Sequence, residues 1–230
     1  MALLPGLADS PALWRGGALA VPAAPGIPTG FPALDAVLPG GGWPVGVLTE
    51  LIAEREGIGE LTLLLPALAK LSGEGRWIAF VAPPRLPYAP ALAAAGVELS
   101  HLVVVQPEGA DARLWAIRQV LASHAFGMVL AWLDEAGGAP LRRLQLAAEG
   151  GSGAAALFRP PAAARQSSPA ALRLRLGLTC GRLAIEVLKR RGPRVCEPVI
   201  LDLPRAVRSH AVVRDLPPQP AAAGLPARHA

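Results

Sequence analysis

The sequence predicts an α/β fold in which helices flank a mainly parallel sheet, with antiparallel strands added at its C-terminal side. Between residues 47 and 159, short apolar segments alternate with helical segments, which is the pattern of parallel strands joined by crossover helices. Residues 170–204 instead alternate apolar with polar or arginine residues, contain frequent turn residues and lack a long helical pattern. We therefore expect antiparallel strands in that stretch, extending the same sheet.

The first half of the domain leads from a short helix into the first two strands. The predicted elements are a helix at 31–38, a strand at 47–53, a helix at 60–71 and a strand at 76–82. A turn containing Gly57 and Gly59 opens the helix at 60–71. Pro66 falls inside this helix, where its missing N–H group and its ring should bend or shorten the helix.

The second half repeats the strand–helix alternation. The predicted elements are a helix at 87–97 that ends at Gly96, a strand at 101–106, a helix at 111–125, a strand at 127–133, a helix at 139–151 and a strand at 154–159. The helix at 111–125 is amphipathic. Its apolar positions are Leu114, Ile117, Val120 and Leu121. The strand at 127–133 is continuously apolar, which is typical of a strand buried on both faces.

The length of 230 residues favours a single domain. We place this domain at residues 27–204, after a flexible N-terminal arm at 1–26 that includes a short helix near residues 11–15. A tail rich in proline and alanine, residues 205–230, is expected to be disordered. The chain shows neither a convincing signal peptide nor a run of about 18 apolar residues that would span a membrane. We therefore expect a cytoplasmic protein.

Cysteine and tryptophan positions are expected to be structural. The two cysteines, Cys180 and Cys196, are too few and too far apart for a zinc site or a redox pair. Their apolar neighbours predict burial in a reducing compartment. Trp77, Trp115 and Trp132 are interpreted as core residues, with interface anchors as the alternative.

The chain is mildly basic, with a formal net charge of +5 and lysine only at Lys70 and Lys189. Such an arginine-rich chain fits an acidic partner such as nucleic acid, but an even spread of charge over a soluble protein fits equally well. Aromatic residues make up only 4% of the chain, which argues against a platform on which bases would stack.

The stretch "EREGIGELTLLL", residues 54–65, has the position of a phosphate-binding loop but not its residues. That loop has the pattern Gly-x-x-x-x-Gly-Lys-Ser/Thr, in which lysine neutralises phosphate charge and the hydroxyl holds Mg²⁺. Counted from Gly59, the first glycine is replaced by Glu54, the lysine by Glu60 and the hydroxyl residue by Leu61. Three acidic residues around such a pocket, Glu54, Glu56 and Glu60, would repel a polyphosphate, so we expect no bound nucleotide, no metal and no other cofactor.

The other parts of an ATPase site are also altered. The strand at 127–133 carries Trp132 near its end, where a metal-organising aspartate is expected. Asp134 and Glu135 follow, and one of them could serve if the register were shifted. The alternative, a solvated entry into the next helix, is favoured. Lys70 lies about 16 Å along a helix from Gly59 and is too far to replace the missing lysine. The chain is therefore not expected to be an enzyme.

Several segments together resemble the core of RecA recombinase. "IPTGFPALDAVLPGGGWPVGVLTEL" is similar to its opening, and "AFVAPPRLPYAPALAAAGVELSHLVVVQP" continues the match. The combination of "GIGEL", "LRRLQLAAE" and "RQSSPAALRLRL" in this order looks like the ImuA family of RecA-related accessory proteins. The resemblance covers about residues 27–204.

The resemblance to ImuA implies a role in damage-induced mutagenic translesion synthesis. The implied partners are an ImuB-type protein resembling a Y-family polymerase, an error-prone replicative-type polymerase and RecA. The same comparison puts Pro83 and Pro84 where RecA has its catalytic glutamate, Glu60 at the lysine and Leu61 at the Mg²⁺-binding threonine. The RecA-like DNA-binding loops are reduced to about "EGGSGA" and "PPAAARQSSP". The resemblance therefore implies a scaffold that contacts DNA indirectly.

Basic residues form three candidate contact sites for a partner or DNA. Arg142 and Arg143 are predicted at the start of a helix, where they would oppose the helix dipole unless a carboxylate compensates. Arg165 lies in the remnant of the second loop. A basic turn between the last strands could touch phosphates or protect an edge strand. This turn contains Lys189, Arg190, Arg191 and Arg194. For each site, ordinary solvent-exposed charge is the alternative.

Two other functions remain open at this point. A SulA-like, damage-induced cell-division inhibitor would share the RecA-like ancestry and the missing lysine, but such inhibitors are typically shorter and lack the strand-rich C-terminal portion. A residual DNA-dependent ATPase is disfavoured by the altered loop.

Overall fold

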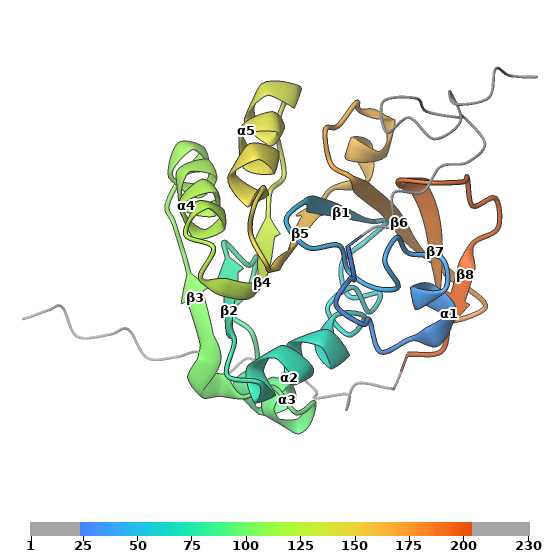
Figure 1. Cartoon of the computed structure of the whole chain (residues 1–230), viewed down its shortest axis with the longest axis horizontal. Coiled ribbons are helices and arrows are strands. Elements are labelled where there is room, and N and C mark those ends of the chain that lie inside the picture. Colours follow the sequence, from blue (N-terminus) through green and yellow to red (C-terminus); the bar gives the residue numbers. More distant parts are fainter. Residues whose placement is uncertain (1–23, 204–230) are drawn as a thin grey trace, which may run out of the picture.

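Eight strands form one sheet in the order β3-β2-β4-β5-β1-β6-β7-β8 in the computed structural model, which describes residues 24–203 (Figure 1). The strands are β1 (Leu48–Ala53), β2 (Trp77–Val81), β3 (Leu102–Val105), β4 (Phe126–Trp132), β5 (Ala154–Arg159), β6 (Leu172–Thr179), β7 (Arg182–Lys189) and β8 (Val199–Leu201). The six strands from β3 to β6 are parallel to one another, whereas β7 and β8 are antiparallel to their neighbours. The predicted fold class is confirmed.

One strand direction differs from the expectation. β6 pairs in parallel with β1, with Leu174 beside Leu51, and only its other edge pairs antiparallel with β7. The connection that contains the short 3-10 helix η2 (Pro161–Arg165) returns the chain from β5 to the opposite edge of β1. Alternation along a strand reports its two faces but not its direction, so the sequence pattern could not reveal this crossover.

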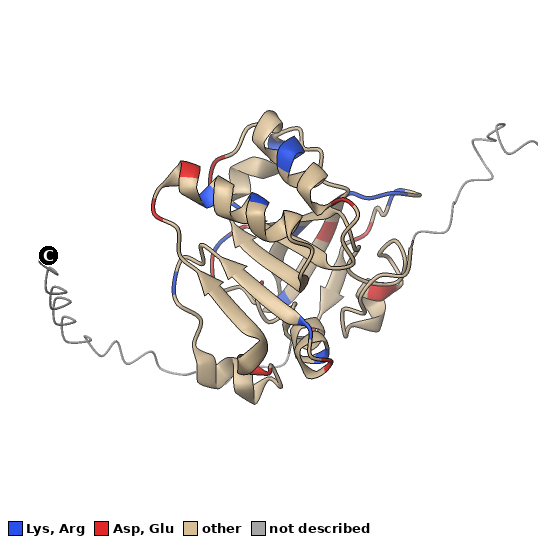
Figure 2. Ribbon diagram, turned by 60° about the vertical axis from the view of Figure 1, so that its left-hand side comes forward, with Lys and Arg blue, Asp and Glu red and all other residues tan. Residues whose placement is uncertain are grey.

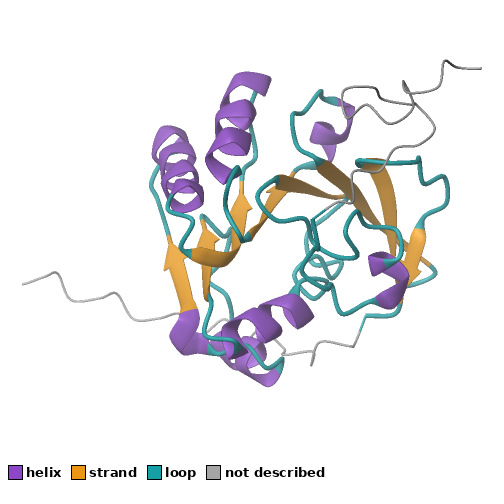
Figure 3. Ribbon diagram, in the orientation of Figure 1, coloured by secondary structure: helices purple, strands orange, loops and turns teal. Residues whose placement is uncertain are grey.

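Helices cover both faces of the sheet (Figure 3). The helices are α1 (Pro32–Asp35), α2 (Leu65–Gly73), α3 (Ala89–Ala94), the 3-10 helix η1 (Leu99–His101), α4 (Ala110–Ala122) and α5 (Gly138–Ala148). α2 packs on one face and α4 and α5 on the other, so each face has its own hydrophobic cluster. The central strand β4 contributes Met128 and Leu130 to the first cluster and Val129 and Ala131 to the second.

The helix predicted at 60–71 is shortened at its start. α2 begins at Leu65, so Pro66 lies in the first turn, where its missing N–H group costs no hydrogen bond. Residues 60–64 form turns instead. At the end of α3, Gly96 has φ +88°, as expected for a glycine that follows a helix.

Several side chains expected in the core are exposed. Both Cys180 and Cys196 are exposed; Cys180 lies in the turn between β6 and β7 with φ +50°. Trp77 and Trp115 are 44% and 59% exposed. Among the described residues, Trp43 is buried in the core and Trp132 packs against the core, partly buried. The apolar residues next to Trp77, Cys180 and Trp115 in the sequence predicted burial. In the structure these residues lie at the start of a strand, in a tight turn and on the outer side of a helix, respectively, where side chains are exposed.

Among the described residues, no helix is long and apolar enough to cross a membrane. The proposed tail at 205–230 and the short helix near residues 11–15 lie outside the described residues, as does most of the arm at 1–26.

A buried ion pair joins β1 to β6 beneath η2. Arg173 Nε donates to Glu50 Oε2 at 2.5 Å, and its Nη2 donates to the carbonyl of Ala163 at 2.6 Å. Both charged side chains are buried. Removing one partner of such a pair costs more than the pair itself contributes, because the remaining charge has no water around it.

We predict that Arg173→Ala lowers the free energy of unfolding by about 3–5 kcal/mol, because it leaves the Glu50 carboxylate buried and unpaired. The double variant Glu50→Met/Arg173→Leu should recover most of this loss. Urea unfolding measures both effects.

The matched control is Arg175→Ala, which removes the more exposed ion pair between β6 and Glu186 of β7. It should cost no more than about 1 kcal/mol. An equal loss for Arg173→Ala and Arg175→Ala would contradict the prediction.

Candidate functional site

The glycine turn, residues 54–64, connects the end of β1 to the start of α2. Gly57 and Gly59 have φ +75° and +106°, which only glycine adopts readily. The Glu60 carboxylate folds back into this turn: the Gly57 N–H donates to Oε1 at 2.9 Å and the Gly59 N–H to Oε2 at 3.1 Å. Successive N–H groups of this kind cradle a phosphate in a nucleotide-binding loop. Here they bind a carboxylate of the chain itself.

Packing gives Gly59 a second, purely structural role. A Cβ atom at this position would lie 2.4 Å from Cδ1 of Leu203. Leu203 follows β8, so the glycine turn lies against the C-terminal end of the described chain. Leu203 can shift to admit a Cβ atom, so it is mainly the φ of +106° that favours glycine here, whether or not a phosphate is bound.

Only two of the three acidic residues expected around the pocket line the cleft described next. Glu56 and Glu60 line it. Glu54 instead continues the pairing of β1 with β6, because its N–H donates to the carbonyl of Leu176 at 3.0 Å. Its carboxylate lies against Gly177, where an added Cβ would approach it to 2.9 Å. The expectation that Glu54 faces the pocket is thus wrong, since the strand pairing directs it elsewhere.

A cleft of about 640 Å³ opens beside the glycine turn at the carboxyl ends of β1, β2, β4 and β5. In open parallel sheets, ligands bind at this edge. Trp132 stacks on Phe158 with ring centroids 4.6 Å apart, and Phe80 lies 5.7 Å from Trp132 on the other side. Leu61 lines the cleft as well. The wall of the cleft is thus largely apolar, where a nucleotide site would present a metal-binding hydroxyl.

One acidic side chain of the cleft is already paired with an arginine. Asp134 lines the cleft, but its Oδ2 accepts a hydrogen bond from Arg113 Nη1 at 3.1 Å, and the side chain is 82% exposed. Pro83 and Pro84 occupy the stretch after β2, where they offer no side chain that could transfer a proton.

Arg159, at the end of β5, brings a buried positive charge to the edge of the cleft. Its Nη2 donates to the carbonyl of Ala136 and to Oε1 of Gln166, both at 3.3 Å. Burial lowers the pKa of this guanidinium, and the nearby Glu50 carboxylate opposes that shift. Sequence reasoning missed Arg159, because an arginine that ends an apolar strand looks like an ordinary exposed residue.

The basic residues predicted as contact sites are distributed over separate parts of the surface. Arg142 and Arg143 are exposed but lie in the second turn of α5, which begins at Gly138. They therefore do not oppose the dipole at the helix start, contrary to the expectation. Arg165 is exposed at the end of η2.

The basic turn after β7 is partly committed to internal contacts. Lys189 Nζ donates to the carbonyl of Ser168 at 2.9 Å. Arg190 donates to the carbonyls of Pro193 and Val37. Arg191 and Arg194 are exposed. Two of these four side chains thus anchor the turn, so at most the other two are free for an external anion.

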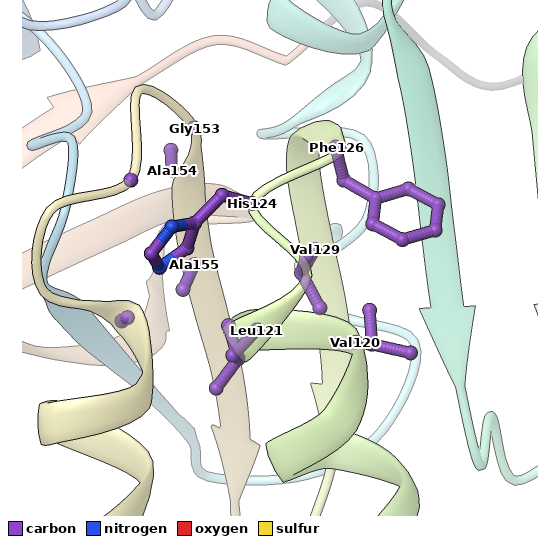
Figure 4. A pocket seen from close by; sticks show the side chains of 10 residues that line it. Val120, Leu121, His124, Phe126, Val129, Gly153, Ala154 and Ala155 are labelled. Carbon is purple, nitrogen blue, oxygen red and sulfur yellow. The ribbon is translucent and has the colours of Figure 1, made fainter.

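A second cavity, at the opposite edge of the sheet, is too small for a ligand. It has about 20 Å³ of space between the end of α4 and the starts of β4 and β5 (Figure 4), room for about one water molecule. His124 points toward the β5 residues Ala154 and Ala155 in this view, and its Nε2 lies 3.3 Å from the carbonyl of Ala147. Within residues 24–203, no cluster of three or more histidine, cysteine or acidic residues could hold a metal ion.

A protein-family model matches the central part of this chain. Residues 36–160, more than half of the chain, match the family model described as MT3502 N-terminal domain. The chain belongs to this family. The matched segment runs from the end of α1 to the end of β5 and so contains the glycine turn and most of the cleft.

Similarity to individual proteins points to RecA and SulA. The cell division inhibitor SulA of Photorhabdus laumondii is 29% identical over 108 residues, which is 47% of this chain and 61% of that protein. Protein RecA of Crocosphaera subtropica is 35% identical over 104 residues, which is 45% of this chain and 29% of that RecA. The matches thus span less than two thirds of either relative.

A solved structure of SulA from Pseudomonas aeruginosa is also similar. It is 27% identical, with a TM-score of 0.41, and covers 49% of this chain and 97% of that chain. The sequence similarities show that the chain is related to RecA and SulA, as the resemblance to a RecA core predicted.

We predict that Glu60→Lys alone does not create an ATP site. The change frees the two N–H groups of the turn, but Leu61 still offers no ligand for Mg²⁺, and Glu54 stands where the loop requires glycine. Isothermal titration calorimetry with ATP and Mg²⁺ should show no binding at millimolar nucleotide.

The matched variant Glu60→Gln keeps the size of the side chain but removes its charge. It should behave like Glu60→Lys in the ATP titration and lose about 1 kcal/mol or more of stability, because hydrogen bonds to a charged acceptor are weakened. Tight ATP binding by either single variant would refute the interpretation of the turn.

Proposed function

We propose that the protein is a non-catalytic, RecA-like accessory or scaffold protein of damage-induced mutagenic translesion DNA synthesis, of the ImuA type. The observation that carries the proposal is the Glu60 carboxylate bound by the N–H groups of Gly57 and Gly59. An internal anion in this position competes with any phosphate, so the nucleotide-driven conformational cycle of a recombinase has no ligand to drive it. The relationship to RecA and SulA supports a role in the response to DNA damage.

As a scaffold, the protein would act by binding partners on its surface rather than by catalysing a reaction. Its proposed partners are an ImuB-type polymerase-like protein, an error-prone replicative-type polymerase and RecA. Contact with DNA would be indirect, made through these partners. The aromatic side chains of the cleft support this assignment, because they pack on one another rather than form an open platform for bases.

A second candidate function is inhibition of cell division. The similarity to SulA of Photorhabdus laumondii, at 29% identity over 61% of that protein, favours it. The C-terminal strands argue against this function, because such inhibitors typically lack a strand-rich C-terminal portion. In this chain β6, β7 and β8 lie beyond residues 36–160 and complete one edge of the sheet. A residual ATPase is the weakest alternative, because it needs the ligands that Glu60 and Leu61 have replaced.

We predict that deleting the gene lowers the frequency of ultraviolet-induced mutation and that the intact gene restores it. The reason is that the scaffold brings the polymerase partners together, so that without it error-prone synthesis across damaged DNA is impaired. Counting resistant colonies after irradiation measures the effect, and spontaneous mutation without irradiation serves as the control.

Overexpression in the same strain separates the two functions. Normal cell length together with reduced induced mutation in the deletion strain supports the scaffold. Filamentous cells on overexpression, together with unchanged induced mutation in the deletion strain, would overturn the proposal in favour of the inhibitor.

A further inference from the structure

A groove runs between α4 and α5 on the outer side of the helical layer. These two helices pack side by side on the face of the sheet opposite α2 (Figure 1). The groove has a volume of about 300 Å³, and its apolar lining comes from Leu114 and Trp115 of α4 and from Pro140 and Leu144 of α5. Ile117 and Leu144 are buried between the helices and the sheet. The groove is therefore preformed by a packed layer, and little ordering is needed before something binds in it.

Large apolar side chains at and beside this groove remain exposed to solvent in the folded chain. Trp115 is 59% exposed, although its neighbours Ala116 and Ile117 are buried. Leu146, one helical turn beyond Arg143 on α5, is 55% exposed. A large tryptophan surface left in water is unfavourable for the isolated chain. Tryptophan is also among the residue types that contribute most to protein–protein binding.

Positive charge without internal partners borders the groove. Arg118 and Arg143 both line it, and among residues 24–203 neither makes a side-chain hydrogen bond or an ion pair. Arg142, exposed beside Arg143, adds a third charge. Blue segments, which are arginine on α4 and α5, are visible on both helices of this layer in Figure 2. Asp111 is the acidic residue in the lining.

We propose that the groove docks an acidic amphipathic segment of a partner protein. Apolar side chains of that segment would cover Trp115, while its carboxylates would pair with Arg118 and Arg143. This is the usual mode in which a helical segment binds an apolar groove, with charge complementarity fixing the orientation. The inference rests on the proposed scaffold function, because it names the surface through which a scaffold would hold one partner.

The chemistry of the groove favours a polypeptide over single-stranded DNA. Proteins that bind single strands combine a continuous basic track with several stacking aromatic rings. This groove presents a single tryptophan with aliphatic side chains beside it, and its two arginines lie among them. It also lies on the opposite face of the sheet from the glycine turn, so that a docked segment leaves the cleft free.

The test uses the full chain and a short fluorescein-labelled helical peptide that carries one stripe of leucines flanked by glutamates. Fluorescence anisotropy should show saturable binding to the wild-type protein. The same peptide with lysines in place of the glutamates should not bind. Trp115→Ala, Arg118→Glu and Arg143→Glu should each weaken binding by about tenfold or more, as expected for tryptophan and arginine at the centre of an interface.

Matched controls separate docking from general effects of charge and folding. Trp77→Ala removes another partly exposed tryptophan, and Lys70→Glu makes the same change in net charge on α2. Both should bind the peptide within about twofold of wild type, because the groove is unchanged. Circular dichroism of each variant confirms that the chain is folded.

Three outcomes would overturn the inference: no saturable binding of the acidic peptide, equal binding by the groove variants and the controls, or tighter binding of a thymidine oligonucleotide that depends on the same three residues. A pull-down with the ImuB-type partner is scored separately. If that partner binds the groove variants as well as wild type, the groove assignment fails and the scaffold function stands. If the partner does not bind the wild-type protein while the peptide does, the scaffold function fails and the groove remains.

Discussion

Burial of the central parallel strands on both faces is the constraint on which the rest of the structure depends. β1, β4 and β5 have helices or loops packed above and below them, so their side chains are almost all apolar and small enough to pack between layers. Polar side chains are thereby restricted mainly to strand ends and to groups that have a hydrogen-bond partner. Glu50 Oε2 accepts from Arg173 while its Oε1 is buried without a partner, and Gln145 of α5 accepts a hydrogen bond from the Leu48 N–H at 3.0 Å.

The same constraint explains how the glycine turn can keep its shape without a nucleotide. A turn that leads from a buried strand into a buried helix must bind its own N–H groups or leave them to a ligand. Glu60 binds two of them, and Leu203 packs against Gly59 from the other side. The turn is therefore held by the chain itself, with Glu60 and Leu61 in the places of the lysine and the hydroxyl residue of a phosphate-binding loop.

Two surfaces remain after the core and the turn are accounted for. The cleft beside the turn is apolar and contains stacked aromatic rings, whereas the groove between α4 and α5 combines an exposed tryptophan with unpaired arginines. They lie on opposite faces of one sheet. A protein related to RecA and SulA thus has two separate surfaces at which other molecules could bind, which is consistent with the proposed scaffold function.

The order of strands and helices, the altered phosphate loop and the shortening of the helix at Pro66 were determined by the sequence itself, because each depends on local periodicity or on the chemistry of a single residue. Tertiary structure alone decided the direction of β6, the burial of Arg173, the exposure of Cys180 and the position of Trp115 and Arg143 at the same groove. These features depend on which segments lie beside each other across many residues, and local patterns carry no record of that pairing. Glu60 belongs to both groups: the sequence showed that the lysine was missing, and only the fold showed its carboxylate in the place of the phosphate.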